Sequence, residues 1–272
     1  VIPGEPLVWW PDSVAGVPNA IIRSALFPAA RAGKDAFFRE SLLSSVNGVK
    51  IVFTGFELCQ SDLDVWLELL RLGRCDLKDE RGVVFCSVFI CVNELLRSLG
   101  RKTGGSDIKW LERSLTRLRA AEVEIEAGKY CYSGHLIDEV VRRPDARVIN
   151  IDLHPNLIRL LGRTGWTGIN IQQRNALRRY PLAQWLHAFY SSHENSDLFK
   201  YSVLTICSLC GSRNQELRMF RRDLKKALRA IAEVTRWEWR IDEKDLIHIG
   251  KPLREEVLIP QGMYAYAIAG RD

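Results

Sequence analysis

The sequence predicts an α+β fold made of two tandem winged-helix domains, and three observations predict it. Each half contains a helix that ends at a glycine, followed by a turn, a basic amphipathic helix and a short β-hairpin, which is the order of a winged helix-turn-helix. The two basic helices also align, with Ile108 and Leu111 matching Leu217 and Phe220, as a duplicated domain would. A length of 272 residues leaves room for two domains.

In the first half, apolar residues at helical spacing predict the helices, and alternating apolar residues predict the strands. One helix, for example, places Leu63, Trp66 and Leu70 on one face and ends near Gly73. The expected elements, in order, are a helix at 18–32, a strand at 49–54, helices at 62–74 and 87–99, a basic helix capped by Ser106 or Asp107 after the Gly-rich turn 100–105, a hairpin of 123–125 with 130–132, and strands at 136–141 and 147–153.

The second half repeats this plan. Its basic helix, at 215–234, places Phe220, Leu224 and Leu228 on one face. The other expected elements are helices at 171–179, 182–193 and 203–210 and a hairpin of 237–241 with 245–249.

Charge is distributed unevenly between the halves. The chain has 39 Lys and Arg against 33 Asp and Glu, a net charge of +6. Residues 1–150 hold equal numbers of basic and acidic side chains, so the excess lies in 151–272. We therefore expect an N-terminal arm at 1–16, a first winged-helix domain at 17–154 and a second at 155–272 with the main basic surface, whose usual partner is a polyanion. Pro155 marks the boundary, because proline restricts the residue before it to extended geometry.

Other features predict a protein of the reducing cytoplasm without metal, cofactor or catalytic activity. The seven cysteines are scattered rather than arranged as a disulfide framework. Cys207 and Cys210 lack the second pair that a four-ligand zinc site needs, so we interpret them as helix thiols. The sequence contains no phosphate-binding loop, no His-apolar-His metal motif of DNA-nicking enzymes and no apolar run long enough to span a membrane. The alternating glutamates of 122–126 are interpreted as a solvated strand face rather than metal ligands.

The basic helix of the second half is the strongest candidate for DNA binding, because the major groove admits one α-helix whose tip reaches base edges while its flanks meet phosphates. Asn214 and Gln215 at the tip suit adenine, Arg213 or Arg218 suits guanine, and Arg222, Lys225 and Arg229 suit phosphates. The alternatives are a solvated basic face for the helix and helix capping for the two amides. The candidate residues of this helix are Arg213, Asn214, Gln215, Arg218, Arg221, Arg222, Lys225, Lys226 and Arg229.

The basic helix of the first half is a weaker candidate, because Asp107 and Glu112 dilute its charge. Lysines at the two hairpin tips are candidate wing contacts to phosphate or to the minor groove, with a solvated turn as the alternative. The candidates are Arg101, Lys102, Lys109, Arg113 and Arg117 in the first unit, and Lys129 and Lys244 at the hairpin tips.

Several short stretches resemble the TrfA family of iteron-binding plasmid initiators. They are Trp10-Pro11-Asp12, Val17-Pro18-Asn19, Arg23-Ser24-Ala25-Leu26-Phe27, Val49-Lys50-Ile51 with Thr54-Gly55 and Glu57-Leu58, Leu63 to Trp66, Phe189-Tyr190-Ser191-Ser192-His193 and Leu209-Cys210-Gly211-Ser212. The resemblance covers about residues 9 to 250. One departure is that Gly4 to Val8 does not match the clamp-binding peptide that family members can carry before Trp-Pro-Asp.

The resemblance implies a replication initiator that binds direct repeats, called iterons, in double-stranded origin DNA. It also implies opening of the adjacent A·T-rich DNA, recruitment of the host helicase and host initiator, and copy-number control through pairing of initiator-bound origins, which needs self-association. Two alternatives remain: a dimeric winged-helix transcriptional repressor, and an interaction module that does not bind DNA. A footprint separates the first from an initiator, because a repressor dimer prefers inverted half-sites whereas two unlike domains in one chain cover an asymmetric site.

Overall fold

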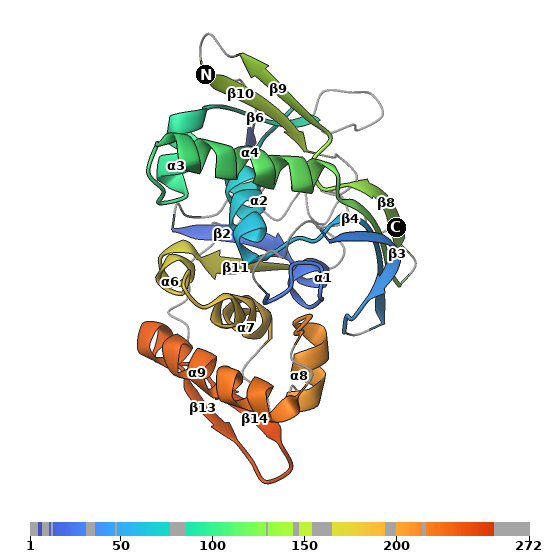
Figure 1. The fold of residues 1–272 in the computed structure, drawn as a ribbon, viewed down its shortest axis with the longest axis vertical. Coiled ribbons are helices and arrows are strands. Elements are labelled where there is room, and N and C mark those ends of the chain that lie inside the picture. The colour runs from blue at the N-terminus through green and yellow to red at the C-terminus, as the bar shows by residue number, and fades with distance from the viewer. Residues whose placement is uncertain are drawn as a thin grey trace.

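The structure is a computed structural model. It describes residues 5–6, 11, 13–30, 36–46, 48–76, 85–128, 130–143, 147–153, 165–193, 200–213 and 216–252. Three predicted site residues, Lys129, Asn214 and Gln215, lie outside these ranges. Within them the chain forms a mixed α and β fold in which a larger N-terminal half stands above a smaller C-terminal half (Figure 1).

Helix α2, which spans Gln60–Leu72, is the centre of the N-terminal half. Its Trp66 side chain is fully buried in the first hydrophobic core, together with residues of α4 and of two sheets. One sheet has the strand order β1-β5-β6-β10-β9 and the other β3-β4-β7-β8. The further elements are β1 (Glu5–Pro6), β2 (Val14–Pro18), α1 (Asn19–Ile22), β3 (Phe37–Leu43), β4 (Val49–Phe56), β5 (Arg74–Asp76), β6 (Phe85–Cys91), α3 (Val92–Ser98), α4 (Gly105–Arg119), β7 (Glu122–Ala127), β8 (Tyr130–His135), β9 (Glu139–Arg143) and β10 (Val148–Leu153).

The C-terminal half has a second core in which α7, α8 and α9 pack together, with Phe189, Phe220 and Leu224 buried. A three-stranded sheet, ordered β12-β14-β13, completes this half, and its strand β13 contacts α9. The elements are β11 (Trp166–Asn170), α6 (Ile171–Ala176), α7 (Pro181–Ser191), β12 (Tyr201–Ser202), α8 (Val203–Leu209), α9 (Leu217–Thr235), β13 (Glu238–Ile241) and β14 (Leu246–Gly250).

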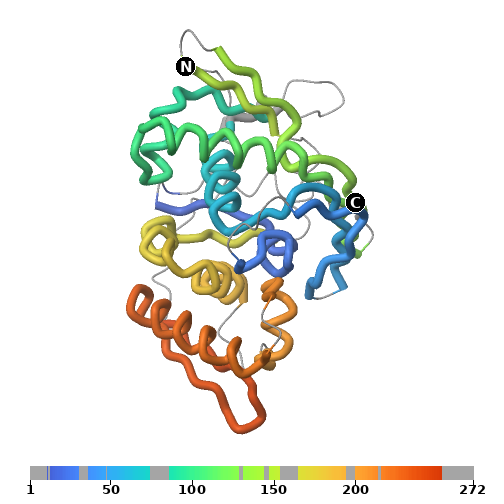
Figure 2. The backbone as a smooth tube through the Cα atoms, viewed as in Figure 1, coloured from blue at the N-terminus to red at the C-terminus, as the bar shows by residue number. Residues whose placement is uncertain are grey.

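The two halves repeat one arrangement of elements. In each, a helix (α2 or α7), a strand (β6 or β12), a seven-residue helix (α3 or α8), a turn and a long helix (α4 or α9) occur in that order, and the first half adds β5 between α2 and β6. In each, the strand before the short helix also pairs with the second strand of a later hairpin, giving the orders β6-β10-β9 and β12-β14-β13. The tube in Figure 2 shows the same helix-turn-helix path in green and in orange.

The halves are joined by an antiparallel pair of strands. Residues of β2 pair with β11, with Gly16 opposite Gly168 at the centre of the register. Strand β2 continues across position 16, where we expected the N-terminal arm to end, so this segment is held against the first strand of the second half. The domain limits at 16/17 and 154/155 otherwise stay predictions.

Three expectations for the first half were wrong. The helix expected at 18–32 is the single turn α1, because the chain then extends to form an isolated bridge between Ser24 and Ser45. The helix expected at 87–99 begins only at Val92, because 85–91 forms the central strand β6, paired on both sides. Alternation of buried Cys86 and Val88 with less buried neighbours fits a strand.

The third correction concerns the first wing. The hairpin expected at 123–132 forms as β7 and β8, but β7 also pairs with β4 along its whole length, so this hairpin is half of a four-stranded sheet with β8 at its edge. Buried Val123 and Ile125 explain why, since they face the first core. The hairpin that pairs with the strand before α3 is instead β9 with β10.

Candidate nucleic-acid interface

Both helix-turn-helix segments turn in the same way. Gly100 and Gly211 end the short helices with φ values of 63° and 61°, which glycine adopts without steric cost. The following amides then bond back to the helix, Arg101 N to Leu96 O at 2.8 Å and Ser212 N to Cys207 O at 3.1 Å, as in a Schellman motif. A Cβ on Gly211 would lie 2.7 Å from the Pro28 Cβ, so only glycine fits there.

Helix α9 is strongly amphipathic. Its apolar side is buried against α7 and α8, whereas its opposite side carries basic residues whose side chains are exposed. At 100° per residue these basic positions fall within an arc of about 100°. The members of this set, which we call the α9 basic face, are Arg218, Arg222, Lys225, Lys226 and Arg229.

Carboxylates barely neutralise the α9 basic face. Within the part of the chain that the structure describes, the ion pair formed by this face is Arg222 with its neighbour Asp223, a long contact of 3.4 Å. Lys226 instead places its Nζ 5.7 Å from the centroid of the Tyr180 ring. A helix face with this density of solvated cations suits phosphates, and its width suits the major groove.

Two other predicted residues around α9 have partners inside the protein. Arg221 forms a two-pronged ion pair with Asp245, with the shortest N···O distance 2.6 Å. This bond raises the pKa of Arg221 and ties α9 to the start of β14. Arg213, just before the helix, pairs with Glu57 of the first half. Lys244 lies exposed in the β13–β14 turn, where its amide bonds to Asp242 Oδ1 at 3.0 Å.

The predicted DNA-binding residues of the first helix-turn-helix, α3–α4, also fall into two groups: side chains that are exposed and side chains that have partners inside the protein. Lys109 and Arg113 lie exposed on α4, and Lys102 lies exposed in the preceding turn. Arg101 is half-buried, with its guanidinium 3.4 Å from the centroid of the Trp110 ring and 3.3 Å from Asp107. Stacking on Trp110 holds Arg101 in place beside the tip of α4.

Arg117 is held in the interior. It donates two hydrogen bonds to the fully buried Asp62, at 2.6 and 3.0 Å, and Ser114 donates a third at 2.6 Å. Sequence spacing placed Arg117 on one arc with Lys109 and Arg113, but Asp62 of α2 captures its guanidinium. This geometry assigns Arg117 to the packing of α4 on α2.

The sequence reasoning missed the residues that connect the two units. Arg174 of α6 is 1% exposed and pairs with Asp64 of α2 at 2.5 Å, while also donating to Gln60 O at 3.1 Å. Arg178, four residues later, donates to carbonyls of the α3–α4 turn. The doubled arginine before Tyr180 was the available signal, although its partners are distant in sequence.

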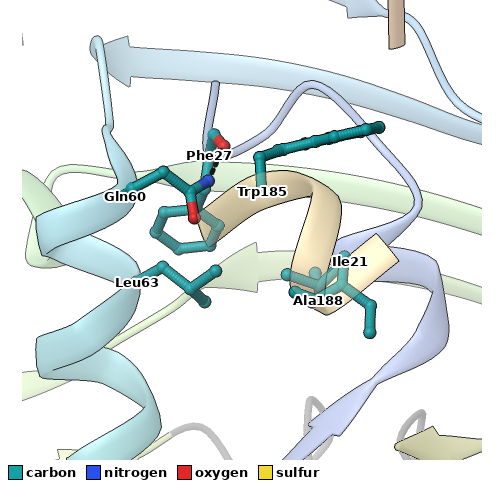
Figure 3. Close-up of a pocket in the computed structure, with 7 residues that line it drawn as sticks. Ile21, Phe27, Gln60, Leu63, Trp185 and Ala188 are labelled. Atoms are coloured by element: carbon teal, nitrogen blue, oxygen red, sulfur yellow. Dashed lines mark hydrogen bonds between the residues drawn. The ribbon is translucent and has the colours of Figure 1, made fainter. Parts of the chain in front are cut away.

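A hollow between the halves is packing and carries no binding site. Phe27, Gln60 and Leu63 line it from the first half and Trp185 and Ala188 from α7 (Figure 3). These side chains leave no room for a water molecule, and the Gln60 amide inside it is bonded to the Phe27 carbonyl. The hollow therefore marks where the two halves interlock.

The cysteines and acidic residues do not form a metal site in the part of the chain that the structure describes. Over the described residues, no three His, Cys, Asp or Glu side chains gather as metal ligands would. Cys210 is fully buried, and burial raises the pKa of its thiol to about 12. In the same part of the chain, no helix combines the length and the apolar character that crossing a membrane requires.

Solved structures with a similar fold are two crystal structures of domains 2 and 3 of RctB. One, a selenomethionine derivative, is 14% identical with a TM-score of 0.51 and covers 85% of this chain and 96% of its own. The other is 13% identical with a TM-score of 0.50 and covers 84% and 94%. At this identity the likeness concerns the fold alone.

Sequence comparison gives the family. The plasmid replication initiator protein TrfA of Escherichia coli is 22% identical over 250 residues, which are 88% of this chain and 62% of the relative. The chain thus spans somewhat less than two thirds of that relative's length. The family described as TrfA protein matches residues 6–251, almost the whole sequence. The chain therefore belongs to the TrfA family.

Proposed function

We propose that this chain is a plasmid replication initiator that binds direct-repeat DNA at the origin without a catalytic step of its own. The α9 basic face carries this proposal, because five exposed cations lie on one side of a long helix, and this helix follows a turn that begins where Gly211 ends α8. Membership of the TrfA family supports it, since the Escherichia coli relative is named a plasmid replication initiator.

Each half is proposed to be a winged helix. The repeated order of helix, strand, short helix, turn, long helix and hairpin supports this, as do the matching strand orders β6-β10-β9 and β12-β14-β13. In such a unit the long helix enters the major groove and the hairpin reaches the neighbouring backbone. Helix α9 with β13–β14 forms one reader, and α4 with β9–β10 forms the other.

The roles of single residues follow from their surroundings. The α9 basic face binds phosphates along one groove, and Lys102, Lys109 and Arg113 do so in the next. Arg117 and Arg221 hold their helices in place through ion pairs. Base contacts by Asn214 and Gln215 and a wing contact by Lys244 stay predictions from sequence. The contact predicted for Lys129 also stays untested, but this residue falls in sequence between β7 and β8 and not in the hairpin β9–β10 that is proposed here as the first wing.

Further roles come only through the named relative and the resemblance to its family. They are opening of A·T-rich origin DNA, recruitment of the host helicase and host initiator in the bacterial cytoplasm, and self-association in copy control. The DNA-binding step proposed here needs no nucleotide, because binding is carried by cations and groove fit.

Hydroxyl-radical footprinting on one origin repeat of the parent plasmid tests the proposal. Two recognition helices on one face of B-DNA enter successive major grooves, so the wild-type footprint spans roughly 20 base pairs. Replacing Lys109 and Arg113 by Ala exposes one end of the site to cleavage, and replacing Arg218 and Arg222 exposes the other. Arg39→Ala is the matched control, because Arg39 is an exposed cation on β3.

Three results would contradict the proposal. Full protection by the Lys109/Arg113 variant would remove the first unit from DNA. Protection of inverted half-sites would favour the repressor, and absence of binding at low salt would favour an interaction module. As a second measurement, the logarithmic salt slope of binding flattens by about one for each phosphate that the protein no longer neutralises, so replacing Arg222 and Lys225 together flattens it by about two.

A further inference from the structure

The turn between α6 and α7, residues 177–180, connects the two helix-turn-helix units. At one end Arg178 donates to the first unit, from Nη2 to Leu99 O at 2.5 Å and from Nη1 to Gly100 O at 3.1 Å. Gly100 admits this contact, because a Cβ there would lie 3.3 Å from Arg178 Nη2. The turn is therefore packed against the start of the α3–α4 turn.

The other end of the same turn meets the second unit. Tyr180 precedes the first residue of α7, and its ring lies 5.7 Å from Nζ of Lys226, a member of the α9 basic face. Figure 1 agrees, since α6 and the start of α7 lie between α3 above and α9 below. Three consecutive residues thus span the distance from one unit to the other.

The middle of this turn points outward. Arg179 is exposed and, among the described residues, forms no ion pair. Tyr180 is 40% exposed. A cation and a phenol hydroxyl side by side are ordinary donors to phosphate oxygens in protein–DNA complexes.

Positive charge continues through the turn from one unit to the other. The pKa of Arg101 is lowered by burial first, is raised by its bond to Asp107, and is lowered again by the nearby charge of Arg178. Arg101 is therefore close to Arg178 at the first end of the turn, and Lys226 is close to Tyr180 at the other end. Arg101 is held by its ion pair with Asp107, and Arg178 by its bonds to carbonyls, whereas Arg179 is exposed.

We propose that Arg179 and Tyr180 form a third DNA contact, on the sugar–phosphate backbone that lies between the two major-groove segments. The inference rests on the proposed function, because the two grooves are those that α4 and α9 enter. Successive major grooves on one face of B-DNA are separated by a minor groove. A short turn fixed to both units lies opposite that groove and sets the spacing between the two readers.

The contact positions the protein and reads no bases. Backbone contacts fix register and orientation without carrying sequence information. Removing this contact therefore weakens binding to matched and scrambled duplexes by the same factor. This separates the turn from the tips of α4 and α9, whose removal changes the ratio between the two duplexes.

The experiment measures binding of the full chain to a duplex carrying one origin repeat and to a scrambled duplex, over a series of salt concentrations. Arg179→Ala is expected to weaken binding to both duplexes about tenfold, the scale of a hydrogen bond to a charged group, and to flatten the salt slope by about one. Tyr180→Phe removes only the hydroxyl and weakens binding by a smaller factor. Arg39→Ala, on β3 across the molecule from α6 in Figure 1, keeps wild-type values.

Footprinting gives an independent readout. Arg179→Ala exposes the centre of the footprint and leaves both ends protected. The third contact is overturned if Arg179→Ala binds as wild type while Arg222→Ala loses affinity, or if protection disappears at one end instead of the centre. Failure of the wild-type chain to bind either duplex at low salt overturns the proposed function itself, and this inference with it.

Discussion

The ion pair between Arg174 of α6 and Asp64 of α2 connects the two halves, and its contribution to the free energy of unfolding can be measured. Its side chain is 2% exposed, and its Nε lies 2.5 Å from Asp64 Oδ1, on a side chain that is 12% exposed. It also donates to the Gln60 carbonyl at 3.1 Å and to the Gln184 carbonyl at 3.4 Å. Arg174→Ala therefore leaves the nearly buried carboxylate of Asp64 without its cation, and it removes a hydrogen-bond donor from the carbonyls of Gln60 and Gln184.

The expected loss follows from burial. Removing one partner of a buried ion pair costs about 3 to 5 kcal/mol, because the other charge stays desolvated without compensation. A pair of similar length at the surface provides the control: Arg142 lies 2.6 Å from Glu112, but both side chains are more than two fifths exposed, at 43% and 45%. Arg142→Ala is expected to cost at most about 1 kcal/mol.

Urea unfolding followed by tryptophan fluorescence gives both free energies by linear extrapolation. The reasoning predicts a difference of at least about 2 kcal/mol between the two variants. If Arg174→Ala loses no more free energy of unfolding than Arg142→Ala, the ion pair does not hold the halves together, and the spacing proposed for the two DNA-reading helices needs another cause.

Three further predictions concern single side chains. Arg117→Ala is expected to cost about 3 to 5 kcal/mol of unfolding free energy, because Asp62 is fully buried, and to leave the salt slope of DNA binding unchanged; a flatter slope with unchanged stability would reverse that assignment. Burial lowers the pKa of His187 to about 3, so below the unfolded value near 6.5 only the unfolded chain takes up this proton, and stability falls as pH falls. This costs about 2 kcal/mol between pH 7 and pH 5, and His187→Gln should remove that part of the pH dependence; an unaltered dependence would refute the cause. Elemental analysis should find no stoichiometric zinc at Cys207 and Cys210, and about one zinc per chain would overturn their interpretation as packing thiols.

The elements that the sequence predicted well are those with a strong local pattern. Helix α9 was expected at 215–234 and spans Leu217–Thr235, because apolar side chains recur along it at helical spacing. Glycines at 100 and 211 marked both helix ends, since each adopts a positive φ that other residues resist. The α9 basic face is readable from the same periodicity, and all five of its cations are exposed.

Partners distant in the chain decided the rest. The apolar run 85–91 suits a strand or a buried helix equally, and only β5 and β10 on either side make it the strand β6. Likewise the hairpin β7–β8 was visible in the sequence, but its pairing with β4 was not. Short periodicities report which face of an element is apolar, and they contain no information about which other element will cover it.

The candidate nucleic-acid interface likewise combines features that the sequence predicts with features that only tertiary contacts decide. Lys109, Arg113 and Arg117 share one helix arc and are indistinguishable by sequence, yet Asp62 takes Arg117 out of solvent. The partners of Arg174 and Arg178 could not be identified from the sequence, because they lie on α2 and in the α3–α4 turn. The sequence by itself determined which helices are basic, since charge and spacing are local properties. Only the tertiary structure decided which of those cations stay free, because an ion pair depends on two groups meeting in space.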